Sequence, residues 1–406
     1  CVQDDVAERL LEMLRGAVQE LRIGDPRRLR TDIGPVIDAR ARSAIERHVE
    51  ALRLRGRSVW RAVLGDAGVG GGPGAEAGHF VAPTVIELDS IGELEAEVFG
   101  PVLHVLRYPR EQLAQTLQAI NATGYGLTQG VHTRIDETVA QVVGASRAGN
   151  IYVNRNIVGA VVGVQPFGGE GLSGTGPKAG GPLYLLRLLA QRPVQAARLA
   201  VAHAGDLARV PVRGLDHPAA ESALDGEALA ALNAWALASG NAVLGARCDQ
   251  ALADSPVGGW HSLRGPTGEA NLYTVLPREA VLCLAGDNAD RLTQLAAVLA
   301  VGSRAVWPVR ARSLRERLPA PVRERISLAL DWTLPGVHFD CVLQHAPAHA
   351  LLATAAELAR RAGPIVSLTG MSPGDPRVPL ERLVIERSLS INTAAAGGNA
   401  SLMTIG

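Results

Sequence analysis

Residues 279–309 constrain the fold most, because they read as strand, helix and strand in direct succession. Residues 279–285 and 303–309 are short apolar runs, and residues 290–301 between them carry apolar side chains at helical spacing. Two parallel strands joined by a helix form a crossover unit of a parallel α/β sheet. The same pattern returns in residues 340–343, 351–362 and 365–368. The sequence therefore predicts an α/β fold.

A second informative stretch, residues 149–182, combines strand patterns with a glycine-dense loop. Residues 150–154 read as a short strand, and the apolar run at residues 160–167 predicts a buried strand. Residues 167–176 include five glycines, so the backbone can adopt positive φ and bring its N–H groups close to an anion. A set of tight turns without a ligand is the alternative.

Gly169, Gly171 and Gly174 also spell the G-x-G-x-x-G pattern of dinucleotide-binding proteins. Such a site needs an acidic residue about 20 residues further on, which binds the ribose. No acidic residue lies between Glu170 and Asp206. We therefore predict that this loop binds no dinucleotide and that a Rossmann half lies upstream.

The first hundred residues alternate helix and strand patterns. Apolar spacings of three and four predict amphipathic helices at residues 4–21 and 38–54. Strands are predicted within residues 79–88 and in the Val/Leu run that ends at Tyr108. Residues 65–78 are glycine-rich without the Lys and Ser or Thr of a phosphate loop, which predicts a flexible surface loop.

Charge balance limits the partners. The 40 Lys and Arg residues equal the 40 Asp and Glu residues, and no basic stripe occurs, so we expect a small-molecule substrate and no nucleic acid partner. No apolar run approaches the roughly 20 residues of a spanning helix, and the first residues do not resemble a signal peptide, which favours a cytoplasmic protein. Four cysteines without a C-x-x-C pair argue against a disulfide framework and against a metal site.

Six motifs occur in a fixed order: DIGPVID, GHFVAPTV, EVFGPVLHV, GYGLTQGV, GNIYVNRN and QPFGG. In this order, residues 1–192 resemble the second half of an NAD-dependent aldehyde dehydrogenase. The longer motif NRNIVGAVVGVQPFGGEGLSGTGPKAGGPLYL resembles the L-glutamate γ-semialdehyde dehydrogenase branch. Residues 265–285 and 386–406 extend the resemblance to bifunctional enzymes of proline catabolism, which join an FAD-dependent proline dehydrogenase to that aldehyde dehydrogenase in one polypeptide.

The resemblance implies roles for five residues. Glu97 would accept hydrogen bonds from the nicotinamide ribose of NAD, and Phe99 would pack near the nicotinamide ring. Gly159 and Ala160 would bind the α-carboxylate of the substrate through backbone N–H groups. Phe167 would form a wall beside the aldehyde chain. Without the resemblance, Glu97 would be read as a solvated surface residue and Phe167 as a core side chain.

The resemblance places no catalytic residue in the chain. Aldehyde oxidation of this kind needs a cysteine thiolate and a general base, and the family has both upstream of the position of Cys1. We therefore expect the chain alone to be inactive. Its four cysteines, Cys1, Cys248, Cys283 and Cys341, are read as small buried apolar residues.

We divide the chain into an aldehyde dehydrogenase portion at residues 1–192, a linker at 193–212 and a C-terminal domain at 213–406. The C-terminal domain, with helices predicted at 227–239 and 241–253, resembles a degenerate copy of the NAD-binding domain. Trp307 stands where the family has a lysine, so we expect no nucleotide site there. Residues 383–406 read as a strand followed by small residues, which forms either a frayed tail or, as the resemblance implies, a lid over the substrate channel.

Two interpretations of function stay open. The first is the enzyme portion described above, with upstream domains of the same polypeptide as partners and any peripheral membrane contact made through them. A variant of this interpretation is part of a monofunctional aldehyde dehydrogenase. The second interpretation is a non-catalytic scaffold or interaction fragment. The sequence upstream of Cys1 separates them. The oligomeric state stays open, with a homo-oligomer among the options.

Overall fold

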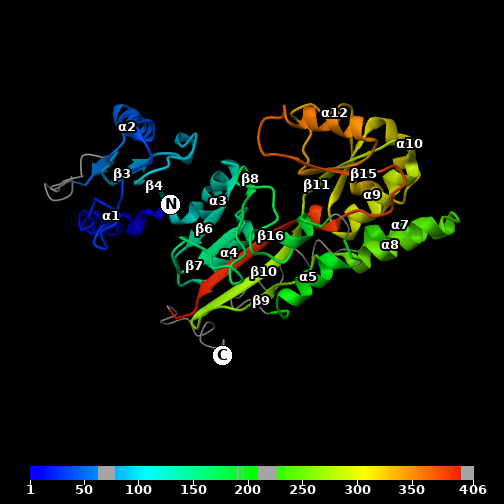
Figure 1. Cartoon of the computed structure of the whole chain (residues 1–406), viewed down its shortest axis with the longest axis horizontal. Helices are drawn as coiled ribbons and strands as arrows, with labels where there is room; N and C mark the ends of the chain where they lie inside the picture. Colours follow the sequence, from blue (N-terminus) through cyan, green and yellow to red (C-terminus); the bar gives the residue numbers. More distant parts are fainter. Residues whose placement is uncertain (63–77, 190–191, 194, 209–225, 395–406) are drawn as a thin grey trace. The chain divides into compact units, whose positions relative to one another are not determined.

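The computed structural model describes residues 1–62, 78–189, 192–193, 195–208 and 226–394 (Figure 1). The chain forms two compact units, residues 1–123 and residues 124–406, which are taken separately below. Apart from Gly78, the loop predicted at residues 65–78 lies outside the described residues.

The first unit is a four-stranded sheet with a helix on each face. Figure 1 shows α1 and α2 on opposite sides of β3 and β4. Its strands, in sheet order, are β1 (Val2–Gln3), β4 (Val102–Tyr108), β3 (Thr84–Leu88) and β2 (Val59–Arg61). Helix α2 (Ala39–Leu54) packs Ile45 against Ile86, and helix α1 (Asp4–Gln19) packs Leu11 against Val85 on the other face. The unit also contains η2 (Ile91–Glu93), η3 (Arg110–Gln112) and α3 (Leu113–Ala122).

Both helices predicted in this unit are confirmed. The apolar spacing places Leu11 on the buried side of α1, and Ile45, Val49 and Leu52 on that of α2. Helix α2 begins after Asp38, whose carboxylate accepts a 2.7 Å hydrogen bond from the Ala41 N–H. Strands β3 and β4 confirm the two strand predictions.

The second unit contains a mixed five-stranded sheet. Its strands, in sheet order, are β6 (Thr128–Val131), β7 (Asn150–Val153), β16 (Val384–Asn392), β10 (Glu269–Pro277) and β9 (His261–Leu263). Strand β16 runs parallel to β7 and antiparallel to β10, beside which it lies in Figure 1. Helix α4 (Asp136–Ala145) packs Val139 and Val143 on this sheet. The sheet thus joins strands from both sides of the boundary predicted at 193–212.

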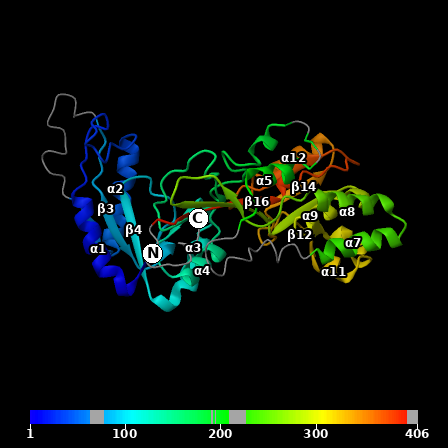
Figure 2. The same ribbon diagram turned by 90° about the horizontal axis from the view of Figure 1, so that it is seen from below.

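A parallel five-stranded sheet forms the rest of this unit's core. Its strands, in sheet order, are β13 (Ile326–Ala329), β12 (Arg304–Pro308), β11 (Ala280–Ala285), β14 (Cys341–His345) and β15 (Ser367–Met371). One face packs against α7 (Glu227–Ala238), α8 (Ala242–Asp254) and α9 (Asn288–Ala300), and the other packs against α12 (Ala348–Leu358). Helices α7 and α8 lie side by side (Figures 1 and 2). The predicted crossover units are confirmed.

The remaining elements of the second unit are short. They are β5 (Tyr125–Gly126), β8 (Glu170–Gly171), η4 (Tyr184–Arg187), α5 (Ala196–Ala204), η5 (Val309–Ala311), α10 (Arg312–Glu316), α11 (Ala320–Glu324) and η6 (Leu380–Arg382). Helix α5 lies within the predicted linker. The division of the chain at 193–212 stays a prediction.

The strand predicted at residues 160–167 is wrong, although the strand predicted at 150–154 is confirmed as β7. Gly159 and Gly163 adopt positive φ, which breaks an extended run, and residues 162–164 form a turn. Val161 and Val162 are 62% and 86% exposed. Only Phe167 makes a β-bridge, to Ala179.

Two further predictions concern the chain end and the cysteines. The predicted terminal strand is β16, a central strand of its sheet, whereas residues 395–406 lie outside the described part. Cys248, Cys283 and Cys341 are buried as predicted, but Cys1 is exposed. Among the described residues, no helix is long and apolar enough to cross a membrane, and no group of three metal-ligating side chains occurs.

Candidate functional site

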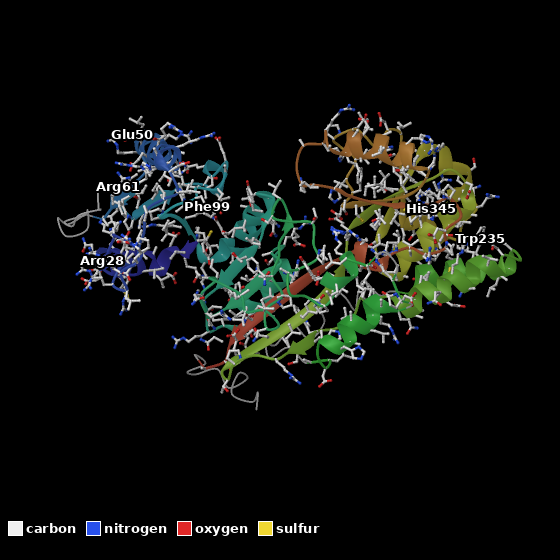
Figure 3. The ribbon with its side chains drawn as sticks, viewed as in Figure 1. Arg28, Glu50, Arg61, Phe99, Trp235 and His345 are labelled. Atoms are coloured by element: carbon white, nitrogen blue, oxygen red, sulfur yellow. The ribbon has the colours of Figure 1, made fainter. Side chains whose placement is uncertain are left out.

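Glu97 and Phe99 lie in the irregular segment between η2 and β4 of the first unit. Glu97 is exposed and makes no hydrogen bond or ion pair with any described residue, so its carboxylate is available to a ligand. Phe99, labelled in Figure 3, is 83% exposed. Gly100 lets this segment approach α2, because a Cβ there would lie 2.4 Å from Ile45 Cδ1. An unpaired carboxylate and an exposed ring on one short segment suit contacts to a polar, aromatic ligand.

Gly159 and Ala160 lie in the loop after β7 in the second unit. Gly159 is exposed, with φ +79°, and Ala160 is half-buried. Within the described residues, neither N–H group donates a hydrogen bond, which leaves two adjacent donors for an anion. The next N–H, of Val161, donates a 2.8 Å bond to Gln165 Oε1. Buried Gln165 in turn donates a 3.0 Å bond to Asn271 Oδ1 on β10, which attaches the loop to the sheet.

Phe167 lies at the other end of the same loop and is half-buried. Its backbone N–H and C=O form hydrogen bonds of 3.0 and 2.8 Å with Ala179. On its N-terminal side, the carbonyl of Pro166 accepts a 2.9 Å bond from Asn150 Nδ2 and a 2.8 Å bond from Ser388 Oγ. The backbone that carries Phe167 is therefore held by β7 and β16.

Lys178 is a buried residue that contacts the same backbone segment. Its side chain is 2% exposed, and Nζ donates bonds of 2.7 Å to Asn150 Oδ1 and 2.5 Å to the carbonyl of Gly168. Burial lowers the pKa of Lys178 to about 7, although Glu386 and Glu170 act in the opposite direction. The sequence reasoning missed this residue. One signal could have found it, because Lys178 is the only lysine in the sequence.

Glu386 of β16 lies next to Lys178 and is half-buried. Its carboxylate accepts 2.7 Å bonds from the Lys178 backbone N–H and from the Tyr273 hydroxyl of β10. Burial raises the pKa of Glu386 and raises that of Tyr273 well above its usual value. A second carboxylate, Glu170, pairs with Arg387 at 3.1 Å, and burial raises its pKa too. These residues make a polar cluster that joins the glycine-dense loop to the C-terminal strands.

The structure brings some of the predicted residues together. Gly159, Ala160 and Phe167 share one loop of the second unit, attached to β7, β10 and β16. Glu97 and Phe99 belong to the first unit, where they share one segment. The glycine-dense residues 168–176 form β8 and turns and open no helix, unlike a dinucleotide-binding loop.

Comparison with known proteins decides the family. The sequence model of the aldehyde dehydrogenase family matches residues 1–194. These residues belong to the aldehyde dehydrogenase family. The resemblance predicted from the motifs is thereby confirmed, and all five predicted site residues lie within the aldehyde dehydrogenase part.

Individual relatives extend the comparison beyond the aldehyde dehydrogenase part. The chain is 55% identical, over 408 residues, to the bifunctional protein PutA of Escherichia coli strain K12, covering 100% of the chain and 30% of that protein. It is 36% identical over 186 residues to 1-pyrroline-5-carboxylate dehydrogenase 1 of Halalkalibacterium halodurans, covering 45% of the chain and 34% of that protein. The chain therefore spans about a third of the length of these relatives.

A solved structure supports the fold over nearly the whole chain. Proline utilization A (PutA) from Corynebacterium freiburgense superposes with a TM-score of 0.59 at 22% identity, covering 95% of this chain and 34% of that one. The predicted α/β fold of the aldehyde dehydrogenase type is confirmed. The aldehyde dehydrogenase match includes Lys178 and Asn150 but not Tyr273, Glu386 and Ser388.

Proposed function

We propose that the chain is part of an NAD-dependent L-glutamate γ-semialdehyde (1-pyrroline-5-carboxylate) dehydrogenase of proline catabolism, which oxidises the semialdehyde to L-glutamate. The observation that carries the proposal is the 55% identity over the whole chain to a protein named bifunctional protein PutA. The similarity of the aldehyde dehydrogenase part to a 1-pyrroline-5-carboxylate dehydrogenase supports the same substrate.

The residues present fit the proposed ligands. The free N–H groups of Gly159 and Ala160 would bind the α-carboxylate of the semialdehyde, and Phe167 would pack along its chain. The unpaired carboxylate of Glu97 would accept hydrogen bonds from the ribose hydroxyls of NAD, and the exposed ring of Phe99 would pack beside the nicotinamide. NAD, when bound, would accept the hydride that the aldehyde carbon loses. The nucleophilic cysteine and the general base would come from the upstream part of the enzyme.

The rest of the proposed polypeptide carries the other partners. An FAD-dependent proline dehydrogenase would lie upstream, in a cytoplasmic protein. The C-terminal domain would seal the channel between the two active sites, with the chain end as a lid. Deleting residues 392–406 should then lower the coupled flux from proline to glutamate more than it lowers folding yield, and equal losses would favour a purely structural role.

An assay of the intact protein tests the proposed activity. We expect NADH formation, followed at 340 nm, with L-glutamate γ-semialdehyde as substrate and with proline when an electron acceptor for the flavin is present. Aldehydes that lack the α-carboxylate should give a much lower kcat/KM, because they leave the Gly159 and Ala160 N–H groups unpaired. Equal kcat/KM for both kinds of aldehyde would contradict the proposed substrate.

A further inference from the structure

Residues 166–168, which carry Phe167 at their centre, have a partner for every backbone polar group. The carbonyl of Pro166 accepts from Asn150 and Ser388, and Phe167 exchanges two bonds with Ala179. The N–H of Gly168 donates a 3.2 Å bond to Asn150 Oδ1, and its carbonyl accepts from Lys178 Nζ. Such complete pairing fixes the backbone, and with it the position from which the Phe167 ring projects.

Two of these donors, the side chains of Ser388 and Lys178, lie outside residues 166–168. Each can therefore be replaced without changing the sequence of the segment itself. Ser388 is 3% exposed and comes from β16, whose register places it opposite Asn150 of β7. Its own N–H donates to the carbonyl of Gly149, so the strand is fixed at this point independently of the hydroxyl. The Ser388 hydroxyl is therefore a specific link from the last strand to the segment that carries Phe167.

Lys178 makes the second link. The chain uses arginine at every other basic position, yet a lysine stands here. An ammonium group is a compact donor, whereas a guanidinium is a wide planar group. Lys178 is only 2% exposed, so the space between Gly168 and Asn150 would not hold a guanidinium. Among the described residues, no carboxylate lies within ion-pair distance of the Lys178 ammonium group. Its direct partners are therefore two neutral acceptors, Asn150 Oδ1 and the Gly168 carbonyl.

We infer that Lys178 and Ser388 are positioning residues, which hold Phe167 in place as the wall of the aldehyde site. The inference rests on the proposed function, because that function makes Phe167 a substrate contact. It follows that a strand outside the aldehyde dehydrogenase match sets the geometry of the substrate site. Loss of either donor leaves a carbonyl beside Phe167 with fewer hydrogen bonds and loosens the ring.

The test compares Lys178→Met, Ser388→Ala and Thr274→Val in the intact enzyme. Thr274→Val is the matched control, because the Thr274 hydroxyl is also buried, on the neighbouring strand β10, but donates to the carbonyls of Gly258 and Gly259, away from residues 166–168. Two quantities are measured: hydrogen–deuterium exchange of peptides covering residues 161–170, and KM for the semialdehyde and for NAD. We expect faster exchange and a KM for the semialdehyde raised about tenfold in the first two variants, with KM for NAD unchanged and Thr274→Val like the wild type.

The outcomes distinguish a failure of the positioning role from a failure of the proposed function. Unchanged exchange at residues 161–170 in both Lys178→Met and Ser388→Ala overturns the inference. A lower yield of active enzyme with unchanged exchange and unaltered KM values would indicate a merely structural role and would also overturn the inference. Faster exchange with an unaltered KM for the semialdehyde would uphold the holding role and overturn the place of Phe167 in the proposed substrate site. Ser388→Ala removes only one oxygen atom, so it keeps the test decisive even if Lys178→Met does not fold.

Discussion

The Tyr273 hydroxyl on β10 donates a 2.7 Å hydrogen bond to Glu386 Oε1 on β16; Tyr273 is fully buried and Glu386 is half-buried. The carboxylate has one other partner among the described residues, the Lys178 backbone N–H. Through this one side chain, strand β16 contacts both the glycine-dense loop and its neighbour β10. The contact ties β16 to the loop that carries the predicted substrate residues.

Replacing Tyr273 with Phe should destabilise the second unit by about 1–3 kcal/mol, because the half-buried carboxylate oxygen Glu386 Oε1 then loses the donor that the fully buried Tyr273 provides. Urea unfolding followed by circular dichroism measures the effect. Tyr184→Phe is the control, since Tyr184 is 43% exposed and its hydroxyl bonds to no described residue. A Tyr273→Phe protein as stable as Tyr184→Phe would show that the bond contributes nothing to folding.

Gly149→Ala should be strongly destabilising, because a Cβ at this position would lie 2.0 Å from the Gly168 carbonyl oxygen and 2.9 Å from Lys178 Nζ. Relief requires movement of residues 166–168, so we expect a loss of roughly 2–4 kcal/mol. Gly144→Ala is the matched control, since its Cβ meets nothing within 4 Å and it lies in helix α4. That change should stabilise by about 0.5–1 kcal/mol. Thermal unfolding of both variants measures the contrast, and equal effects would contradict the close approach.

The first unit should lose stability in acid through a histidine pair. His48 Nε2 and His104 Nε2 lie 2.8 Å apart, and burial together with the His48 charge lowers the pKa of His104 to about 4. The unfolded chain, with an ordinary histidine pKa near 6.5, binds the proton first, so stability is lost as the pH falls from about 6.5 to 4. With allowance for the partial exposure of the rings, the loss is about 1 kcal/mol.

Hydrogen exchange of peptides from α2 and β4 at pH 7 and pH 4.5, corrected for the intrinsic rate, measures this loss. His104→Gln cannot bind the proton and should show a smaller acid effect. His79→Gln changes an exposed histidine of the same unit and should behave like the wild type. An identical acid response in all three proteins would rule out the pair as its source.

Glu97→Gln should raise KM for NAD about 10- to 100-fold in the intact enzyme, because a neutral amide replaces the charged acceptor of the ribose hydroxyls. KM for the semialdehyde should change little. Glu95→Gln serves as the control, since Glu95 is exposed on the same segment. Steady-state kinetics with NAD varied gives the answer, and an unchanged KM for NAD would remove Glu97 from the cofactor site.

Local patterns in the sequence were sufficient for most of the helices and strands. Residues 279–309 encode strand, helix and strand by apolar spacing alone, and β11, α9 and β12 follow it closely. The same reasoning failed at residues 160–167, where an apolar run was read as a buried strand. Gly159 and Gly163 turn the backbone there, and Val162 points to solvent. Apolar character alone does not distinguish a buried strand from an exposed loop.

The sequence by itself determined the α/β class, the aldehyde dehydrogenase motifs and the five residues that those motifs carry. Only the tertiary structure brought Ser388 to Pro166, 222 positions away in the chain, and placed Lys178 against Asn150 and Gly168. The physical reason is that secondary structure follows local periodicity, whereas a buried hydrogen bond depends on which strands pair and in which register. The pairing of β16 with β7 sets that register, so the last described strand of the chain decides how the loop that carries the proposed substrate residues is held.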